Sequence, residues 1–398
     1  MTDLSFLDRE IAELKAKGRY RFLRRLSTPQ DAAIRIDGKP LWNFSSNNYL
    51  GLANHPEVVA ALSGYAERYG VGSGASRLIS GHMEVHAELE EAVARFKGAE
   101  ACLSFSSGYL ANLGILQTLG GPDTTIFSDE LNHASVVDGC RLSRSVVEIY
   151  RHADVSHLED LLRRSRARRK IVVTDGVFSM DGDIAPLPGI VEVKERHGAL
   201  LVVDDAHATG VLPPRGRGSA EHFGLSGRVD IRMGTFSKAL GTYGAFLCGT
   251  RRLVDYFINR CRPFIFNTGL PPAIAGATLA ALRRIDGDPS LLAALWRNGD
   301  LFREEMGARG RPVVSGTAIV PILVGGDRDT MAVSQALFDR GFFIHGIRPP
   351  TVPEGTGRLR LTLMATHPPE RVREAAAAID DALRERGIGA DGEAAPAG

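Results

Sequence analysis

Seven short apolar runs, separated by helix-like segments, dominate the middle of the chain. They are ACLSF (101–105), TTIFSD (124–129), SVVEIY (145–150), KIVVTD (170–175), ALLVVDD (199–205), DIRMGTF (230–236) and GAFLCGT (244–250). Several are apolar without polar alternation, as strands buried on both faces are. Strands that alternate with helical segments predict an α/β fold around a mostly parallel sheet.

Polar side chains gather where these strands are expected to end. Thr174 and Asp175 close one run, Asp204 and Asp205 close another, and Thr235–Ser237 follow a third. In open α/β sheets, ligands bind outside the carboxyl ends of the strands. We therefore expect the chemistry of this chain at that edge of the sheet.

The flanking segments predict further parts of the molecule. Leu4, Leu7, Ile11 and Leu14 recur at helical spacing, which predicts an amphipathic helix that docks on the body or on a partner subunit. After about residue 290, helix-like segments flank three expected strands, IVPILVG, FFIHGI and RLRLTL, as in a smaller α+β domain. A small-molecule cleft is expected between the two domains. The predicted parts are an N-terminal arm and helix (1–45), a large domain (46–288), a small domain (289–386) and a disordered tail (387–398).

The composition argues against several classes of protein. Lys and Arg number 48 against 47 Asp and Glu, so neither nucleic acid nor a membrane surface is an expected partner. The one basic run, RRSRARRK (163–170), predicts a solvated helix end. The cysteines form no C-x-x-C pair, and no run approaches the ~18 apolar residues of a membrane span. Because the N-terminal segment is charged throughout, we expect no signal peptide and a cytoplasmic location.

Two short blocks suggest a covalent cofactor. GTFSKALGTYGAF (234–246) places a single lysine, Lys238, among small residues beside an expected strand. Such a lysine is either an exposed loop residue or a desolvated nucleophile. LLVVDDAHATG (200–210) ends a buried strand in two aspartates, which either cap backbone groups or hold a cation.

Pyridoxal phosphate (PLP) would use this combination of residues. It needs a lysine, an acid beside the pyridinium nitrogen, a group on the ring hydroxyl, a side chain against the ring face, and phosphate donors. The candidates are Lys238 as the lysine, Asp204 as the acid, Ser179 and His207 at the ring oxygen, His133 against the ring, and Gly108 and Tyr109 at the phosphate, while Thr235 adds a hydroxyl near Lys238. No metal is expected.

The same blocks resemble those of the α-oxoamine synthases, fold-type-I PLP enzymes that condense an amino acid with an acyl thioester. The resemblance runs from about residue 18 to 385, through NFSSNNYLGL, GVGSGASRLISG, SSGYLAN, NHASVVDG, TDGVFSMDGD, VDDAHATG, TFSKALG and NTGLPP. It implies a large PLP-binding domain with a smaller α+β domain, and Lys238, His133, Asp204 and His207 as catalytic residues. It also implies that Thr268 reaches the phosphate of the other subunit, and therefore a homodimer.

The stretch IRPPTVPEGTGRLRLTL (347–363) most resembles a family member that joins L-alanine to pimeloyl-CoA or a pimeloyl-carrier protein in biotin biosynthesis. The implied reaction is a decarboxylating Claisen condensation with Lys238 as the general base. Arg358 and Arg360 alternate with leucines, so both should face one side of a strand, as carboxylate ligands or as a plain charged face. The implied substrate contacts are Arg360, Asn47 and His133, with Thr351 and Arg21, for which Arg24 is the rival.

Other functions compete with this interpretation. The cofactor residues alone also fit an aminotransferase, and relatives that use glycine with acetyl-CoA or serine with a long-chain acyl-CoA would share them. His82 and His86 in HMEVH are spaced as zinc ligands can be, but the glutamate is misplaced for H-E-x-x-H. GVGSGAS is not G-x-G-x-x-G and follows a helical pattern, which argues against a dinucleotide enzyme.

Overall fold

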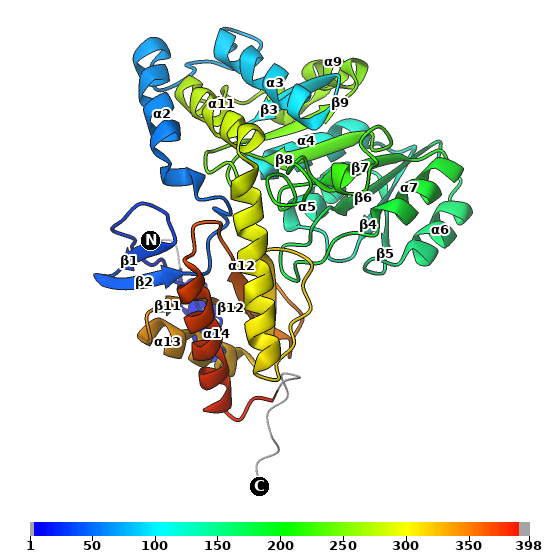
Figure 1. The fold of residues 1–398 in the computed structure, drawn as a ribbon. Helices are drawn as coiled ribbons and strands as arrows, with labels where there is room; N and C mark the ends of the chain where they lie inside the picture. The colour runs from blue at the N-terminus through cyan, green and yellow to red at the C-terminus, as the bar shows by residue number, and fades with distance from the viewer. Residues whose placement is uncertain (1–3, 390–398) are drawn as a thin grey trace. The chain divides into compact units, whose positions relative to one another are not determined.

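The computed structural model describes residues 4–389 (Figure 1). The chain divides into two compact units. The larger unit comprises residues 47–179 and 183–294, and the smaller unit comprises the chain up to residue 46, Met180–Gly182, and the chain from residue 295. Within residues 4–389, no helix is long and apolar enough to cross a membrane.

A seven-stranded sheet forms the centre of the larger unit. Its order is β3 (Ala101–Phe105), β9 (Ala245–Gly249), β8 (Ile231–Thr235), β7 (Leu200–Asp204), β6 (Arg169–Asp175), β4 (Thr124–Asp129) and β5 (Val146–Tyr150). All pairings are parallel except those of β9 with β3 and β8. All seven apolar runs of the sequence are strands of this sheet, so the predicted α/β fold is confirmed.

Helices cover both faces of the sheet (Figure 1). On β6, Ile171 and Val173 join a core cluster that includes Ile115 of α4, while Val172 joins a second cluster that includes Leu158 of α6. Successive strand side chains thus pack on opposite faces, which explains why these runs lack polar alternation. The helices of this unit are α2 (Pro56–Tyr69), α3 (Glu84–Lys97), α4 (Gly108–Leu119), α5 (Ala134–Leu142), α6 (Val155–Arg164), α7 (Leu187–Arg196), α8 (Ser219–His222), α9 (Arg251–Arg260), α10 (Arg262–Ile265) and α11 (Pro272–Gly287), with a short 3-10 turn at Leu52–Asn54.

The smaller unit contains two three-stranded sheets. One has the order β1 (Ala33–Ile36), β2 (Lys39–Asn43), β11 (Phe342–Phe343), and the other the order β10 (Ile319–Gly325), β13 (Gly357–Thr362), β12 (His345–Ile347). The run FFIHGI was expected to form one strand, and this is wrong: β11 pairs with β2 and β12 pairs with β13, so the run is divided between two sheets. The helices are α1 (Ser5–Ala16), α13 (Asp327–Asp339) and α14 (Pro369–Arg384), and α12 (Pro289–Ala308) enters this unit at residue 295.

The two ends of the chain differ in their packing. Helix α1 forms at the predicted spacing, but Leu4, Leu7, Ile11 and Leu14 are all exposed. At the other end, Ile388 is buried and its carbonyl accepts a hydrogen bond from Arg311. Residues 390–398 of the predicted tail lie outside the described residues.

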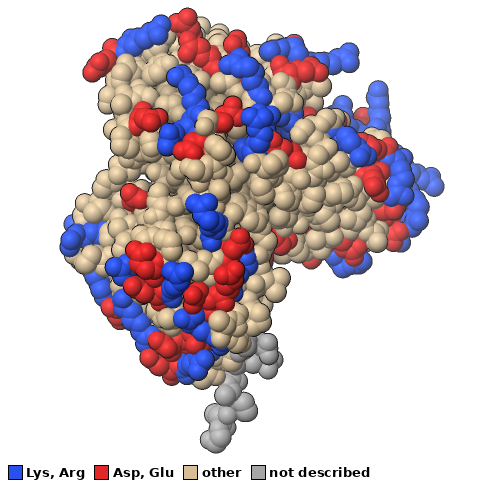
Figure 2. All heavy atoms as spheres, viewed as in Figure 1, with Lys and Arg blue, Asp and Glu red and all other residues tan. Residues whose placement is uncertain are grey.

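Basic and acidic side chains are interspersed on the face shown in Figure 2. The basic run 163–170 contains the last turn of α6 and the start of β6, and Arg163, Arg164, Arg166 and Arg168 are exposed there. The run is therefore a solvated helix end and loop, as predicted.

Candidate active site

A pocket of about 170 Å³ lies at the carboxyl ends of the strands of the larger unit. Its lining comprises Gly108, Tyr109, Asn112, His133, Ser135, Asp175, Val177, Asp204, Ala206, His207, Met233, Thr235, Ser237 and Lys238. The structure thus brings together seven of the residues singled out in the sequence: Gly108, Tyr109, His133, Asp204, His207, Thr235 and Lys238.

One side of the pocket is the N-terminus of α4. Ser107 is the N-cap and its side chain accepts a hydrogen bond from the Leu110 amide at 3.3 Å, so the helix begins at Gly108. The first amides of a helix have no intrahelical acceptor and favour an anion. A Cβ on Gly108 would lie 2.7 Å from Thr235 Cγ2, so only glycine permits this close approach. The buried Thr235 hydroxyl has no hydrogen-bond partner among the described residues.

Asp204 is a buried acceptor at the tip of β7. One carboxylate oxygen accepts the Ala206 amide at 2.8 Å, and the other accepts Nδ2 of Asn112 at 2.7 Å. Asn112 also donates to the Ser135 hydroxyl at 2.9 Å, which fixes its amide orientation. Because a carboxylate can accept about four hydrogen bonds, Asp204 keeps capacity for a protonated ring nitrogen.

Asp205 has a different environment from its neighbour. Its carboxylate pairs with Lys97 Nζ at 2.9 Å and accepts the Ser219 hydroxyl at 2.6 Å. It is not among the residues that line the pocket. Of the two adjacent aspartates, Asp204 alone faces the pocket.

The histidines of the pocket have defined partners. His133 Nδ1 accepts the Ser135 amide at 3.2 Å and lies 2.7 Å from the Ser135 hydroxyl. Desolvation lowers the pKa of His133; the charge of Asp204 opposes this shift and the charge of Lys238 adds to it. A neutral ring that carries its proton on Nε2 fits this arrangement. His207 Nδ1 lies 2.7 Å from the Tyr49 hydroxyl.

Asn112 and Ser135 line the pocket although neither was predicted from the sequence, and Asp175 lines it as one of the polar strand ends expected there. Burial raises the pKa of Asp175 well above its usual value, and the charge of Asp204 raises it further. Asn112 stands four residues after Gly108, which places it one helical turn from the anion-binding end of α4. That spacing was the only available signal for Asn112.

These groups fit PLP. The pocket offers an amine at Lys238, a carboxylate at Asp204, an imidazole at His133, and the α4 amides with an unpartnered hydroxyl at Thr235. An anionic phosphate suits the helix N-terminus, and a pyridinium suits the buried carboxylate.

Three other predicted residues belong to the larger unit but do not line this pocket: Asn47, Ser179 and Thr268. Thr268 is exposed and forms an isolated antiparallel bridge with Ser76. Ser179 directly precedes Met180–Gly182, the short segment that belongs to the smaller unit.

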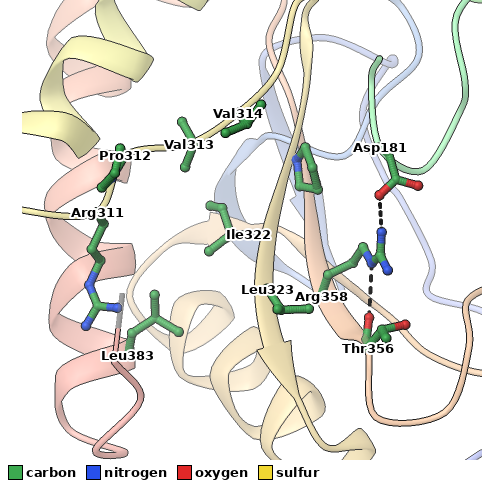
Figure 3. Close-up of a pocket in the computed structure, with 11 residues that line it drawn as sticks. Asp181, Arg311, Pro312, Val313, Val314, Ile322, Leu323, Thr356, Arg358 and Leu383 are labelled. Atoms are coloured by element: carbon green, nitrogen blue, oxygen red, sulfur yellow. Dashed lines mark hydrogen bonds and ion pairs between the residues drawn. The ribbon is translucent and has the colours of Figure 1, made fainter. Parts of the chain in front are cut away.

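The predicted substrate residues of the smaller unit lie in several places. Arg21 and Thr351 line a pocket of about 480 Å³ together with Arg24 and Arg348. Arg360 is buried in β13, and its Nη1 donates to Thr362 Oγ1 at 3.2 Å. Arg358 lines a different pocket of about 450 Å³, where it contacts Asp181 and donates to the Thr356 carbonyl (Figure 3).

His82 and His86 are both engaged in hydrogen bonds. His82 Nδ1 accepts from Arg77 Nε at 3.1 Å, and the two ring nitrogens of His86 meet the Met83 amide and the Leu270 carbonyl. Among residues 4–389, no group of three or more His, Cys, Asp or Glu side chains could hold a metal ion.

Comparison with known proteins defines the family. Residues 39–379 match the family model described as aminotransferase class I and II, so the chain belongs to this family of fold-type-I PLP enzymes. The predicted membership of its α-oxoamine synthase branch is confirmed by the relatives below.

The chain is 50% identical, over 95% of its length and 98% of the relative, to 8-amino-7-oxononanoate synthase of Geobacter sulfurreducens (strain ATCC 51573 / DSM 12127 / PCA). It resembles a serine palmitoyltransferase variant from S. paucimobilis, solved with PLP and myriocin, at a TM-score of 0.92 and 33% identity over 97% of this chain and 100% of that one. It resembles 8-amino-7-oxononanoate synthase from Francisella tularensis at a TM-score of 0.75 and 28% identity, over 87% and 99% of the two chains.

Proposed function

We propose that this chain uses PLP to condense L-alanine with a pimeloyl thioester, releasing CO2 and free thiol and forming 8-amino-7-oxononanoate, a step of biotin biosynthesis. The observation that carries the proposal is the pocket at Asp204 and Lys238, in a chain that is 50% identical to an 8-amino-7-oxononanoate synthase over nearly the full length of both.

The bound cofactor would supply an electron sink for negative charge at the substrate's α-carbon. The α4 amides of Gly108 and Tyr109 and the Thr235 hydroxyl would hold the phosphate. Asp204, oriented by Asn112, would keep the ring nitrogen protonated. His133 would cover the ring face, with His207 and Ser179 at the ring oxygen.

Lys238 has two roles in this proposal. Its amine would hold the cofactor before the amino acid binds, and would remove the α-proton as a general base afterwards. Its position in the pocket with Asp204 and His133 supports both roles.

The substrate contacts belong to this proposal too. Arg360 of the smaller unit would bind the carboxylate of alanine through its planar guanidinium. The pocket around Arg21 and Thr351 also contains apolar side chains of Phe22, Leu23 and Ile347, which suits an acyl chain that ends in a carboxylate. Arg24 stacks over the rings of Phe22 and Phe338 at 5.1 and 4.4 Å, so its guanidinium is engaged and Arg21 is favoured.

We also propose a homodimer with shared sites. Thr268 is exposed, and three large apolar side chains from the same loops are largely exposed: Val71 (85%), Ile79 (81%) and Phe266 (71%). The Ser76–Thr268 bridge joins these loops. A second copy that covers these apolar side chains would bring its phosphate site toward Thr268 of the first copy.

A screen of donors and acceptors tests the proposal. Alanine, glycine and serine are each assayed with pimeloyl, acetyl and palmitoyl thioesters, as CoA and carrier-protein forms, by following thiol release. We expect the highest kcat/KM for alanine with a pimeloyl thioester, and a larger loss for Arg21→Ala than for Arg24→Ala. The highest value for serine with palmitoyl-CoA, or for glycine with acetyl-CoA, would overturn the substrate assignment.

A further inference from the structure

A fully buried ion pair lies directly after Asp204 in the chain. Lys97, the last residue of α3, donates from Nζ to Asp205 Oδ2 at 2.9 Å, and both side chains have no exposed surface. Taking two charges out of water costs several kcal/mol per ion, and their attraction often only offsets this cost. Such a pair is therefore a weak source of stability, and its placement calls for another explanation.

The Lys97 ammonium contacts both ends of the segment 205–209, which carries His207 and directly follows Asp204. Besides Asp205, it donates to Thr209 Oγ1 at 3.2 Å and to the Arg217 carbonyl. The Thr209 amide in turn donates to the Asp205 carbonyl at 2.8 Å. One lysine therefore closes the turn 205–209 by its side-chain contacts, and His207 stands at the middle of that turn.

The Asp205 carboxylate is held on its other side as well. Oδ1 accepts the amide and the hydroxyl of Ser219 at 3.1 and 2.6 Å. A Cβ on Gly176, or on Gly218 where φ is +102°, would overlap this carboxylate. Gly176, the segment Gly218–Ser219 and Lys97 of α3 thus surround one side chain that does not line the pocket.

We propose that Lys97 and Asp205 are positioning residues that hold Asp204 against the ring nitrogen of the cofactor and His207 at its ring oxygen. The proposal rests on the proposed function. The reason is geometric: the Asp205 backbone amide bonds to the Met233 carbonyl of β8, its side chain bonds to α3 and α8, and Asp204 is the next residue back along the chain. Loss of the pair frees the turn, and the Asp204 carboxylate loses its fixed direction.

The test separates a positioning role from a merely structural one. Dissociation constants are measured for PLP and for its 1-deaza analogue, in which the ring nitrogen is replaced by carbon. In the unaltered protein, a charge-assisted bond from Asp204 to the ring nitrogen should favour PLP by about tenfold or more. We expect Lys97→Met and Asp205→Asn to bring this ratio close to one.

The control is Lys194→Met. Lys194 pairs with Asp230 at 3.0 Å, and Asp230 accepts the Leu201 amide near the opposite end of β7. This variant should lose less thermal stability than Lys97→Met, because the Asp230 side chain is 29% exposed, and it should keep the affinity ratio. Thr209→Val leaves the ion pair intact but removes one Lys97 contact, so it should lower the affinity ratio partially. If Lys97→Met does not fold, the ratio of Thr209→Val tests the positioning role.

Two outcomes distinguish the claims. An unchanged ratio in the folded Lys97, Asp205 and Thr209 variants would overturn the positioning role while the proposed function stands. Failure of the unaltered protein to bind PLP would overturn the proposed function itself.

Discussion

At the residue scale, the pocket combines two buried carboxylates with one amine. Burial and the charge of Asp204 both raise the pKa of Asp175, because two carboxylates in one apolar site resist being ionised together. Asp204 has a hydrogen-bond donor at each oxygen, the Ala206 amide at one and the Asn112 side chain at the other. Asp204 is therefore the carboxylate whose direction in the pocket is fixed.

Replacing the Asp204 side chain tests its role. Asp204→Asn keeps the shape of the side chain but cannot hold a ring proton. We expect folded protein that exchanges the α-proton of alanine with deuterium at least about a hundredfold more slowly. The exchange is followed by NMR. Asp175→Asn is the matched control and should slow the exchange much less, because burial and the charge of Asp204 disfavour the charged form of Asp175. Near-normal exchange in Asp204→Asn would refute the assignment.

A residue of the pocket could be predicted where its type is rare among its neighbours in the sequence. A lone lysine among small residues, two aspartates at a strand end and a glycine between a strand and a helix marked Lys238, Asp204 and Gly108. Asn112 and Ser135 carried no such mark, since a polar residue within a helix is ordinarily solvated. Their role depends on a hydrogen bond across 23 residues of sequence, which only the fold creates.

At the element scale, His152 ties two segments of the pocket's surroundings together. Its ring nitrogens lie 3.0 Å from Asp129, the last residue of β4, and 2.9 Å from Asp183, and its ring packs edge-on against Phe178 at 4.4 Å. Hydrogen bonds to Asp129 and Asp183 raise the pKa of His152 to about 10. His133 lies four residues after Asp129, and Ser179 lies four residues before Asp183.

The interactions of His152 with Asp129 and Asp183, called the His152 clamp below, predict how the stability of the protein changes with pH. The pKa of His152 is higher in the folded chain, about 10, than its ordinary 6.5. The stability it supplies is therefore complete below about pH 6.5 and is lost as the pH rises through about 10. We expect the Tm of the unaltered protein to fall over this interval and that of His152→Gln to fall less. His222→Gln, on α8, is the control. Parallel pH profiles for the unaltered protein and His152→Gln would contradict the clamp.

The elements themselves were predictable where one local signal sufficed. The seven strands of the large sheet follow from their apolar runs. The division of FFIHGI does not, because sheet membership is decided by partners far away: Phe342 pairs with Trp42, and His345 pairs with Arg360. The β1–β2 hairpin was missed although its turn is Asp37-Gly38, where both residues have positive φ. Asp-Gly between strands is a strong hairpin signal.

At the scale of the whole molecule, the larger unit carries the pocket at Asp204 and Lys238, and the smaller unit carries Arg21, Thr351 and Arg360. Each unit has its own sheet structure, so the proposed cofactor residues and these three proposed substrate residues belong to separate frameworks.

Sharing of sites between two copies can be tested by complementation. Lys238→Ala and Thr268→Ala variants are co-expressed. If Thr268 serves the neighbour's phosphate, each mixed dimer contains one site with both residues intact, and random assortment makes these about a quarter of all sites. We expect that share of sites to bind PLP as tightly as the unaltered protein does. No recovery beyond the separate variants would contradict the shared site.

The most direct test of the central claim follows the carboxyl carbon of alanine. The purified protein, loaded with PLP, is incubated with a pimeloyl thioester and alanine labelled with carbon-13 at the carboxyl group. Condensation with decarboxylation predicts labelled CO2, an equal amount of free thiol, and unlabelled 8-amino-7-oxononanoate by mass spectrometry. Label retained in pyruvate, with no thiol released, would contradict the account and indicate an aminotransferase.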